Sequence, residues 1–117
     1  MTLHTDLVSG RWGELTLAQQ LANVGSEVDR AIRSWEAGRT ARFDNALDRA
    51  LELFDLTARD DRWRGPRRRE ILRAREEFCR LFFDDESHPE SARGLSRYFL
   101  QFAILARSNE AGVRGFE

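Results

Sequence analysis

Apolar residues recur along four segments of the chain at the three- and four-residue spacing of an α-helix. The clearest row has steps of four, three, four, four and three residues, and predicts an amphipathic helix over about residues 16–37. Its members are Leu17, Leu21, Val24, Val28, Ile32 and Trp35. Thr16 can cap this helix, and Gly38 stands where a glycine commonly ends one. One face of this helix is therefore expected to lie against a core.

Two further rows flank that apolar face. Small residues at Ala18, Ala22 and Gly25 would let another helix approach closely. The other row is polar, and consists of Gln20, Asn23, Glu27, Arg30 and Ser34. This polar row is either a solvated helix face or a buried network between subunits that fixes their register.

Three more helices are expected over about residues 40–59, 66–84 and 88–108. Pro66 suits a first helical turn, and Ser87 and Glu90 have the spacing of a capping box. There is no internal repeat and no convincing strand. The pattern predicts an all-α protein, an antiparallel four-helix bundle that forms a single domain over residues 1–117. Residues 1–15 would form an N-terminal arm with Trp12 as a possible anchor.

The last predicted helix is apolar over more than half of its circumference, although a helix in a small bundle needs only one stripe. Leu100 and Ile104 point away from the face that carries Leu95, so another surface must cover them. That surface is either a second subunit or the apolar residues of the arm, Leu3, Leu7, Val8 and Trp12. With Phe82 and Phe83 as surplus aromatic residues, the pattern favours a homo-oligomer whose interface includes Phe82, Phe83, Leu100 and Ile104.

Composition places the chain among globular proteins. It has 117 residues, of which 41% are hydrophobic and 33% charged, and this length suits one domain. The net charge of −1 gives no overall attraction to nucleic acid or membrane, so any such attraction must be local. All 19 basic residues are arginines, whose planar guanidinium suits bidentate pairing with carboxylate or phosphate.

We expect a cytoplasmic protein with no membrane partner. Cys79 is the only cysteine, which excludes an internal disulfide and fits a reducing compartment. The N-terminal residues lack the basic and apolar regions of a signal peptide, and no apolar run approaches the ~20 residues of a membrane span. Cys79 falls within an apolar pattern, which predicts a small buried side chain.

The chain offers little catalytic chemistry. His4 and His88 have no Cys or His at ligand spacing, whereas zinc needs about four convergent ligands. Glu76 and Glu77 begin the magnesium motif of the all-α nucleotide pyrophosphatases, but Arg80 stands where a third carboxylate is required. There is also no glycine-rich phosphate loop. We therefore expect no enzyme activity, no metal or other cofactor, and no small-molecule substrate.

Charge is strongly polarised along the third predicted helix. From Arg59 to Arg75 there are eight arginines and three acids, and from Glu76 to Glu90 there are six acids and one arginine. The basic end coincides with the helix N-terminus, whose backbone N–H groups already carry partial positive charge. This arrangement is unfavourable by about 0.3–1 kcal/mol per exposed charge.

Three partners could offset that charge. The acidic row of the preceding helix (Asp44, Asp48, Glu52 and Asp55) could pair with Arg69, Arg73 and Arg80. The acidic end of a second subunit could do the same. A nucleic-acid backbone is the third, with Trp63 stacking on a base. The phosphate contacts would come from Arg62, Arg64, Arg67, Arg68, Arg69 and Arg73.

Four phrases carry a resemblance: "LAQQLANVGSEVDRAI", "ALDRALELFDLTARDDRWRG", "REILRAREEFCRLFF" and "LSRYFLQFAILAR". Together, over about residues 15–107, they resemble a family of small, uncharacterised helical proteins from bacteria and archaea. That family has no established activity, so the resemblance implies a helical fold and assigns no site residue. In helix count and size only, the chain is also similar to the oligomeric four-helix accessory proteins of diversity-generating retroelements, which bind nucleic acid.

These observations favour a non-enzymatic helical-bundle interaction protein, which acts as a homo-oligomer or as an accessory subunit of a larger complex with an unidentified protein. The alternative is a nucleic-acid-binding accessory protein that uses the basic segment from Arg59 to Arg75.

Overall fold

The computed structural model describes the backbone of residues 11–84 and 89–115, and the side chains of residues 11–84 and 89–108. Four long helices dominate it: α2 (Leu17–Glu36), α3 (Thr40–Arg59), α4 (Pro66–Phe83) and α5 (Pro89–Gly115). A short helix α1 (Trp12–Glu14) precedes them, and a 3₁₀ turn η2 (Asp61–Trp63) joins α3 to α4. The described residues contain no strand. The all-helical prediction is therefore confirmed, and the last helix extends beyond its predicted end at residue 108.

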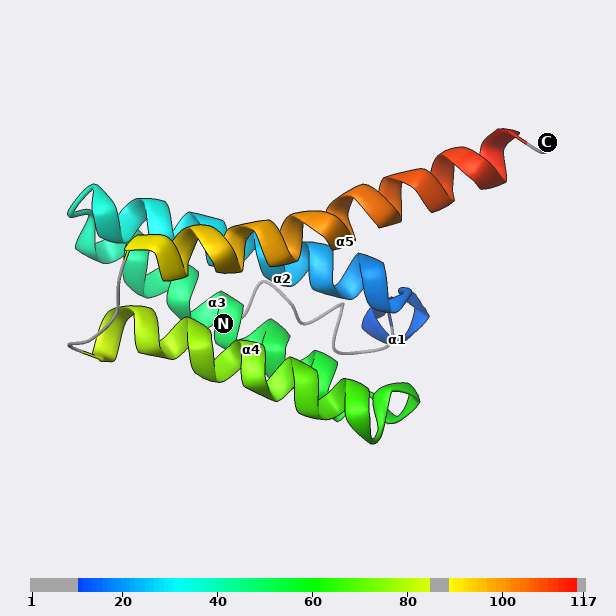
Figure 1. The fold of residues 1–117 in the computed structure, drawn as a ribbon, viewed down its shortest axis with the longest axis horizontal. Coiled ribbons are helices and arrows are strands. Elements are labelled where there is room, and N and C mark those ends of the chain that lie inside the picture. The colour runs from blue at the N-terminus through cyan, green and yellow to red at the C-terminus, as the bar shows by residue number, and fades with distance from the viewer. Residues whose placement is uncertain (1–10, 85–88, 116–117) are drawn as a thin grey trace.

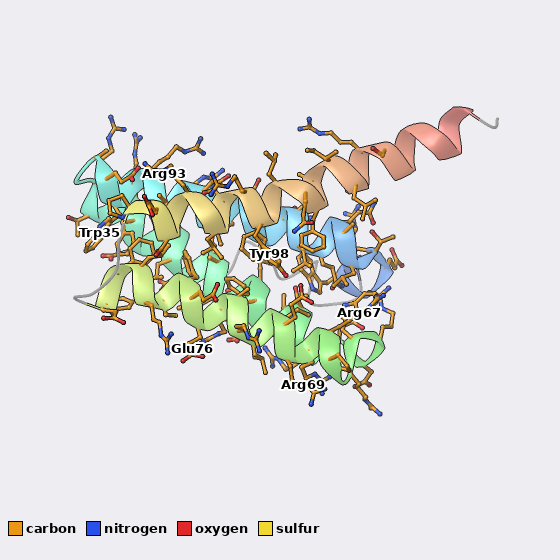
Figure 2. All side chains as sticks on the ribbon, viewed as in Figure 1. Trp35, Arg67, Arg69, Glu76, Arg93 and Tyr98 are labelled. Carbon is orange, nitrogen blue, oxygen red and sulfur yellow. The ribbon has the colours of Figure 1, made fainter. Side chains whose placement is uncertain are left out.

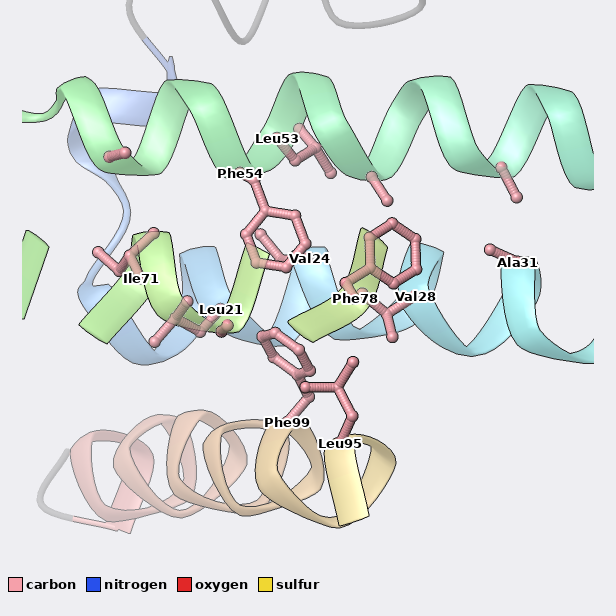
Figure 3. Close-up of a cluster of buried hydrophobic side chains, with 14 of the residues drawn as sticks. Leu21, Val24, Val28, Ala31, Leu53, Phe54, Ile71, Phe78, Leu95 and Phe99 are labelled. Atoms are coloured by element: carbon pink, nitrogen blue, oxygen red, sulfur yellow. The ribbon is translucent and has the colours of Figure 1, made fainter. Parts of the chain in front are cut away.

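The four long helices pack around a common hydrophobic core. α2 contacts both α3 and α5, and α4 lies against α3 and α5 on the other side (Figure 1). Aromatic side chains from three helices meet in the centre, where the Phe54 ring lies 5.7 Å from Phe78 and 5.8 Å from Phe99, centroid to centroid (Figure 3). Val24 and Val28 of α2 are fully buried in the same cluster.

The α2 and α5 backbones come closest at Gly25. A Cβ atom at this position would lie 2.5 Å from the Cβ atom of Phe99, much closer than two non-bonded carbon atoms can approach. Only glycine therefore permits this helix separation. The sequence prediction that small residues on α2 allow a close helix approach is confirmed at this position.

Local chemistry fixes the helix ends. Thr16 caps α2, since its Oγ1 accepts from the Gln19 backbone N–H at 3.1 Å while Gln19 Oε1 accepts from the Thr16 backbone N–H at 2.9 Å. Gly38 has a φ of +70° and Gly65 a φ of +87°, a backbone region that other residues rarely adopt. The capping box predicted for Ser87 lies outside the described residues.

The polar row of α2 is not uniformly solvated. Gln20, Glu27 and Ser34 are buried, whereas Asn23 and Arg30 are exposed. Gln20 makes three hydrogen bonds within this chain: Nε2 donates to Trp12 O (2.8 Å) and to Asp60 Oδ2 (3.0 Å), and Oε1 accepts from Trp63 Nε1 (2.8 Å). The solvated interpretation is wrong for the three buried residues. The Gln20 network joins segments of one chain.

Trp12 anchors the start of the described chain, because its side chain is buried in the core next to Gln20. The other arm residues expected to cover α5, Leu3, Leu7 and Val8, lie outside the described residues.

α5 is longer than its neighbours. Its 27 residues span about 40 Å, whereas the 20 residues of α2 and of α3 span about 30 Å. Its C-terminal end consequently projects past the other helices (Figure 1). In the described part of the chain, no helix combines the length and apolar character needed to cross a membrane.

Candidate functional site

Arg62, the first of the predicted phosphate ligands, is held within the chain. Arg62 Nη2 forms an ion pair with Asp60 Oδ2 at 2.7 Å and also donates to the Leu15 carbonyl at 2.8 Å. This hydrogen bond from Arg62 is the main reason why the pKa of Asp60 falls to about 2, and the hydrogen bond from Gln20 adds to it. Arg62 therefore ties the α3–α4 connection to the chain before α2.

Arg68 shows how one charge at the N-terminus of α4 is offset. Its Nε donates to the Ala58 carbonyl at 2.6 Å. That carbonyl belongs to the last turn of α3, where backbone C=O groups have no partner within the helix and carry partial negative charge.

Arg64 pairs with Asp61 at 3.0 Å, but both side chains are largely exposed, so this pair adds little stability.

Trp63 is not available to stack on a base. Its side chain is buried and its Nε1 donates to Gln20. The guanidinium of Arg62 lies 4.5 Å from the ring centroid and that of Arg67 lies 5.7 Å away, as cation–π contacts do. The stacking role predicted for Trp63 is therefore wrong, because the indole is part of the core.

The pairing predicted between the acidic row of α3 and α4 is wrong in its details. Asp55 pairs with Arg75, at 3.0 Å, and Arg80 pairs with Glu76 on its own helix. The other members of the row (Asp44, Asp48 and Glu52) make no ion pair with any described residue. The reason is geometric, since Arg75 lies one residue from the buried Ala74 and faces α3.

Arg69 and Arg73 lie instead in a groove between α4 and α5, and make no ion pair among the described residues. The same groove contains Glu70 and Glu77, so its charge is mixed. Tyr98 OH donates to Glu70 Oε1 at 2.6 Å, and burial together with this carboxylate raises the pKa of Tyr98. That Arg67, Arg69 and Arg73 bind phosphate stays a prediction.

An apolar pair, Leu100 and Ile104, lies on the outward side of α5. The two residues are 55% and 56% exposed, and their i, i+4 spacing makes them neighbours on one side of the helix. Ala106 and Phe99, by contrast, are buried on the side that faces the core. Within the described part of the chain, these two residues, which the sequence predicts to need a cover, are more than half exposed.

The aromatic residues predicted for the same interface lie elsewhere. Phe82 is half-buried and its ring packs at 5.3 Å from Trp35 and 4.8 Å from Phe43, centroid to centroid. Phe83 is 68% exposed at the end of α4. Leu100 lies eleven residues into α5, about 16 Å along that helix from its start. The four predicted interface residues therefore do not form one patch.

Sequence reasoning missed other features of the surface. Trp35 belongs to the apolar row that the sequence predicts to face inward, but its side chain is 50% exposed, and Leu105 is also half-exposed. Cys79 is only partly buried. A second concentration of arginines surrounds the connection between α2 and α3. The net charge summed over successive stretches of the sequence does not reveal this concentration, because acids such as Glu36 and Asp44 lie between the arginines.

Among the described residues, no three His, Cys, Asp or Glu side chains gather as a metal site would require. No protein-family model, curated protein or solved structure matches the chain. The resemblance to small helical proteins of bacteria and archaea therefore stays a prediction.

Proposed function

We propose that the protein is a non-enzymatic, cytoplasmic, antiparallel four-helix bundle that works by associating with a second copy of itself through the outward side of α5. The course of the ribbon, in which consecutive long helices reverse direction, supports the bundle arrangement (Figure 1). The observation that carries the proposed association is the exposure of the α5 apolar pair, Leu100 and Ile104.

The energy available from this pair sets the expected strength. Full burial of a leucine or isoleucine side chain contributes about 1.5–3 kcal/mol, so each half-exposed member would contribute about 1 kcal/mol. A twofold interface uses the same surface on both copies, which gives about 4 kcal/mol from four side chains. A micromolar dimer needs about 8 kcal/mol, so further contacts must contribute.

The projecting part of α5 supports a second copy as the source of those contacts. It extends beyond the other described helices of its own chain (Figure 1), and an isolated helix is only marginally stable in water. Two copies paired along α5 would pack this length together with the apolar pair.

Light scattering after size-exclusion chromatography tests the proposal. The protein concentration should run from about 1 to about 100 µM, a range that brackets the dissociation constant of a micromolar dimer. The mass should rise above 13.6 kDa with concentration, and Ile104→Glu should return it to the monomer value. Leu72→Glu is the matched control, because Leu72 is 45% exposed but lies on α4. Its mass should equal that of the unmodified protein.

A monomer at every concentration would refute self-association, and a pull-down would then test the accessory-subunit alternative. An oligomer that persists in Ile104→Glu would refute α5 as the interface, and its loss in Leu72→Glu would point to α4 instead. Circular dichroism should show that both variants keep their helix content.

A further inference from the structure

A groove between α2 and α3 concentrates positive charge at the end of the molecule that carries Trp35. It has a volume of about 520 Å³. Five arginines line it: Arg30, Arg33, Arg39, Arg42 and Arg49. Its other walls are Ser34, Ala37, Asn45 and Ala46, so no carboxylate of the described residues lines it. The end that carries Trp35 lies opposite the end that carries Arg67 and Arg69 (Figure 2).

Four of these five arginines have no polar side-chain partner among the described residues. Arg30 pairs with Glu27 at 3.0 Å. The others make no hydrogen bond or ion pair through their side chains with any residue that the structure describes. The basic segment differs, since most of its arginines bind carboxylates or backbone carbonyls. Counted over the described residues, the groove therefore has more arginines without a polar partner than the basic segment does.

The start of α3 adds to the positive charge. Arg39 occupies its N-cap without a side-chain cap hydrogen bond, and no acid lies in its first turn. The first backbone N–H groups of a helix carry partial positive charge and favour an anion. Spacings of three and four residues place Arg42, Asn45 and Arg49 along one side of this helix, so the charge continues from its end into the groove.

The shape of this surface suits several phosphates better than one. From Arg39 to Arg49, α3 rises about 15 Å, so a single phosphate cannot reach all the arginines. Guanidinium groups bind phosphate oxygens in bidentate geometry. None of the described residues that line the groove is aromatic, so they offer a nucleotide base no surface on which to stack.

We propose that this groove binds a chain of phosphate groups, as found in a single-stranded nucleic acid or in inorganic polyphosphate. Binding would be insensitive to base sequence, because phosphates carry no sequence information. The groove includes no residue of α5, so this binding is independent of the association proposed above.

Fluorescence anisotropy with a labelled thymidine oligonucleotide tests the proposal. If about three phosphates are engaged, a slope of about −0.7 per phosphate predicts that tripling the salt weakens binding roughly tenfold. Competition separates the sources: unlabelled oligonucleotide and inorganic polyphosphate should both displace the probe, and inorganic monophosphate at equal phosphate concentration should not. If the oligonucleotide does not bind, titration with inorganic polyphosphate followed by calorimetry should still show binding, which would assign the groove to polyphosphate. Equal competition by monophosphate would overturn the phosphate-chain proposal.

Two double variants locate the site. Arg42→Gln with Arg49→Gln should weaken binding more than tenfold. Arg69→Gln with Arg73→Gln tests the rival site, the groove between α4 and α5, whose two arginines also have no ion pair among the described residues. If the groove between α2 and α3 is the binding site, this variant should change affinity less than threefold. Equal losses, a larger loss in this second variant, or no binding of any probe at low salt would overturn the proposal. If the first variant does not fold, Arg33→Gln replaces an exposed residue on the α2 side of the groove and should weaken binding at least threefold. Unchanged affinity in this variant would overturn the proposal.

Discussion

Replacement of Gly25 by alanine tests whether α2 and α5 pack at the separation that the structure gives them. Glycine in a helix interior is less favourable than alanine by about 1 kcal/mol, so the substitution alone should stabilise α2. The new methyl group, however, would lie 2.5 Å from Phe99 Cβ and 3.1 Å from Phe99 Cγ. Because Phe99 Cβ is attached to the α5 backbone, a rotamer change cannot relieve the clash.

The size of the effect follows from the displacement required. Carbon atoms pack at about 3.5–4.0 Å, so α5 would have to move by roughly 1 Å. Overpacking of this kind costs about 1–3 kcal/mol, and the movement also loosens the contact between the Phe99 and Phe54 rings. After the gain in helix propensity, we expect a net destabilisation of about 1–2 kcal/mol.

Gly94 offers a matched control. It lies inside α5, and a Cβ atom there would meet nothing within 4 Å. Gly94→Ala should therefore stabilise the protein by about 0.5–1 kcal/mol. Urea unfolding followed by circular dichroism, at one protein concentration, measures both variants. The reasoning is refuted if Gly25→Ala stabilises the protein as Gly94→Ala does, because α2 and α5 would then not meet at this position.

Three other predictions concern the connection between α3 and α4. Gln20→Met should lower the unfolding free energy by about 2–4 kcal/mol, because it leaves buried polar groups unsatisfied, whereas Gln101→Met at an exposed site should change it by less than about 0.5 kcal/mol. The pKa of Asp60 is about 2 in the folded protein and 3.8 ordinarily, so ionised Asp60 stabilises the fold above pH 3.8 and this contribution is lost as the pH falls toward 2. Because Arg62 is partly exposed, this contribution to the unfolding free energy should be only about 1 kcal/mol. Asp60→Asn should not show this loss of stability when it is unfolded by acid. Gly65→Ala should cost about 1–3 kcal/mol in urea unfolding, since φ is +87° there, and an unchanged midpoint would contradict this.

The helices could be predicted from sequence because local physics determines them. Apolar residues at three- and four-residue spacing mark the inward faces, and Thr16, Gly38 and Pro66 mark ends whose chemistry lies within one turn. The burial of Gln20 could not be predicted in this way. Its partners Trp12 and Trp63 are 8 and 43 residues away, and they meet only after the helices have packed.

The distribution of charge was harder to predict than the helices. A net count along the chain treats Arg62 and Arg69 alike, although Arg62 is bound to Asp60 and Arg69 has no ion pair among the described residues. The same count misses the groove between α2 and α3, because its arginines come from two helices. Packing of those helices, rather than closeness in sequence, brings the guanidinium groups together.

The hydrogen bonds of Gln20 have a consequence for where the folding unit begins. A chain truncated just before Thr16 would keep all four long helices, yet it would lose the Trp12 carbonyl that accepts from Gln20 Nε2 and the buried indole beside it. The smallest stable unit must therefore contain every segment that contributes to the hydrogen bonds of Gln20. It includes residues before α2 that a definition based on the four long helices would leave out.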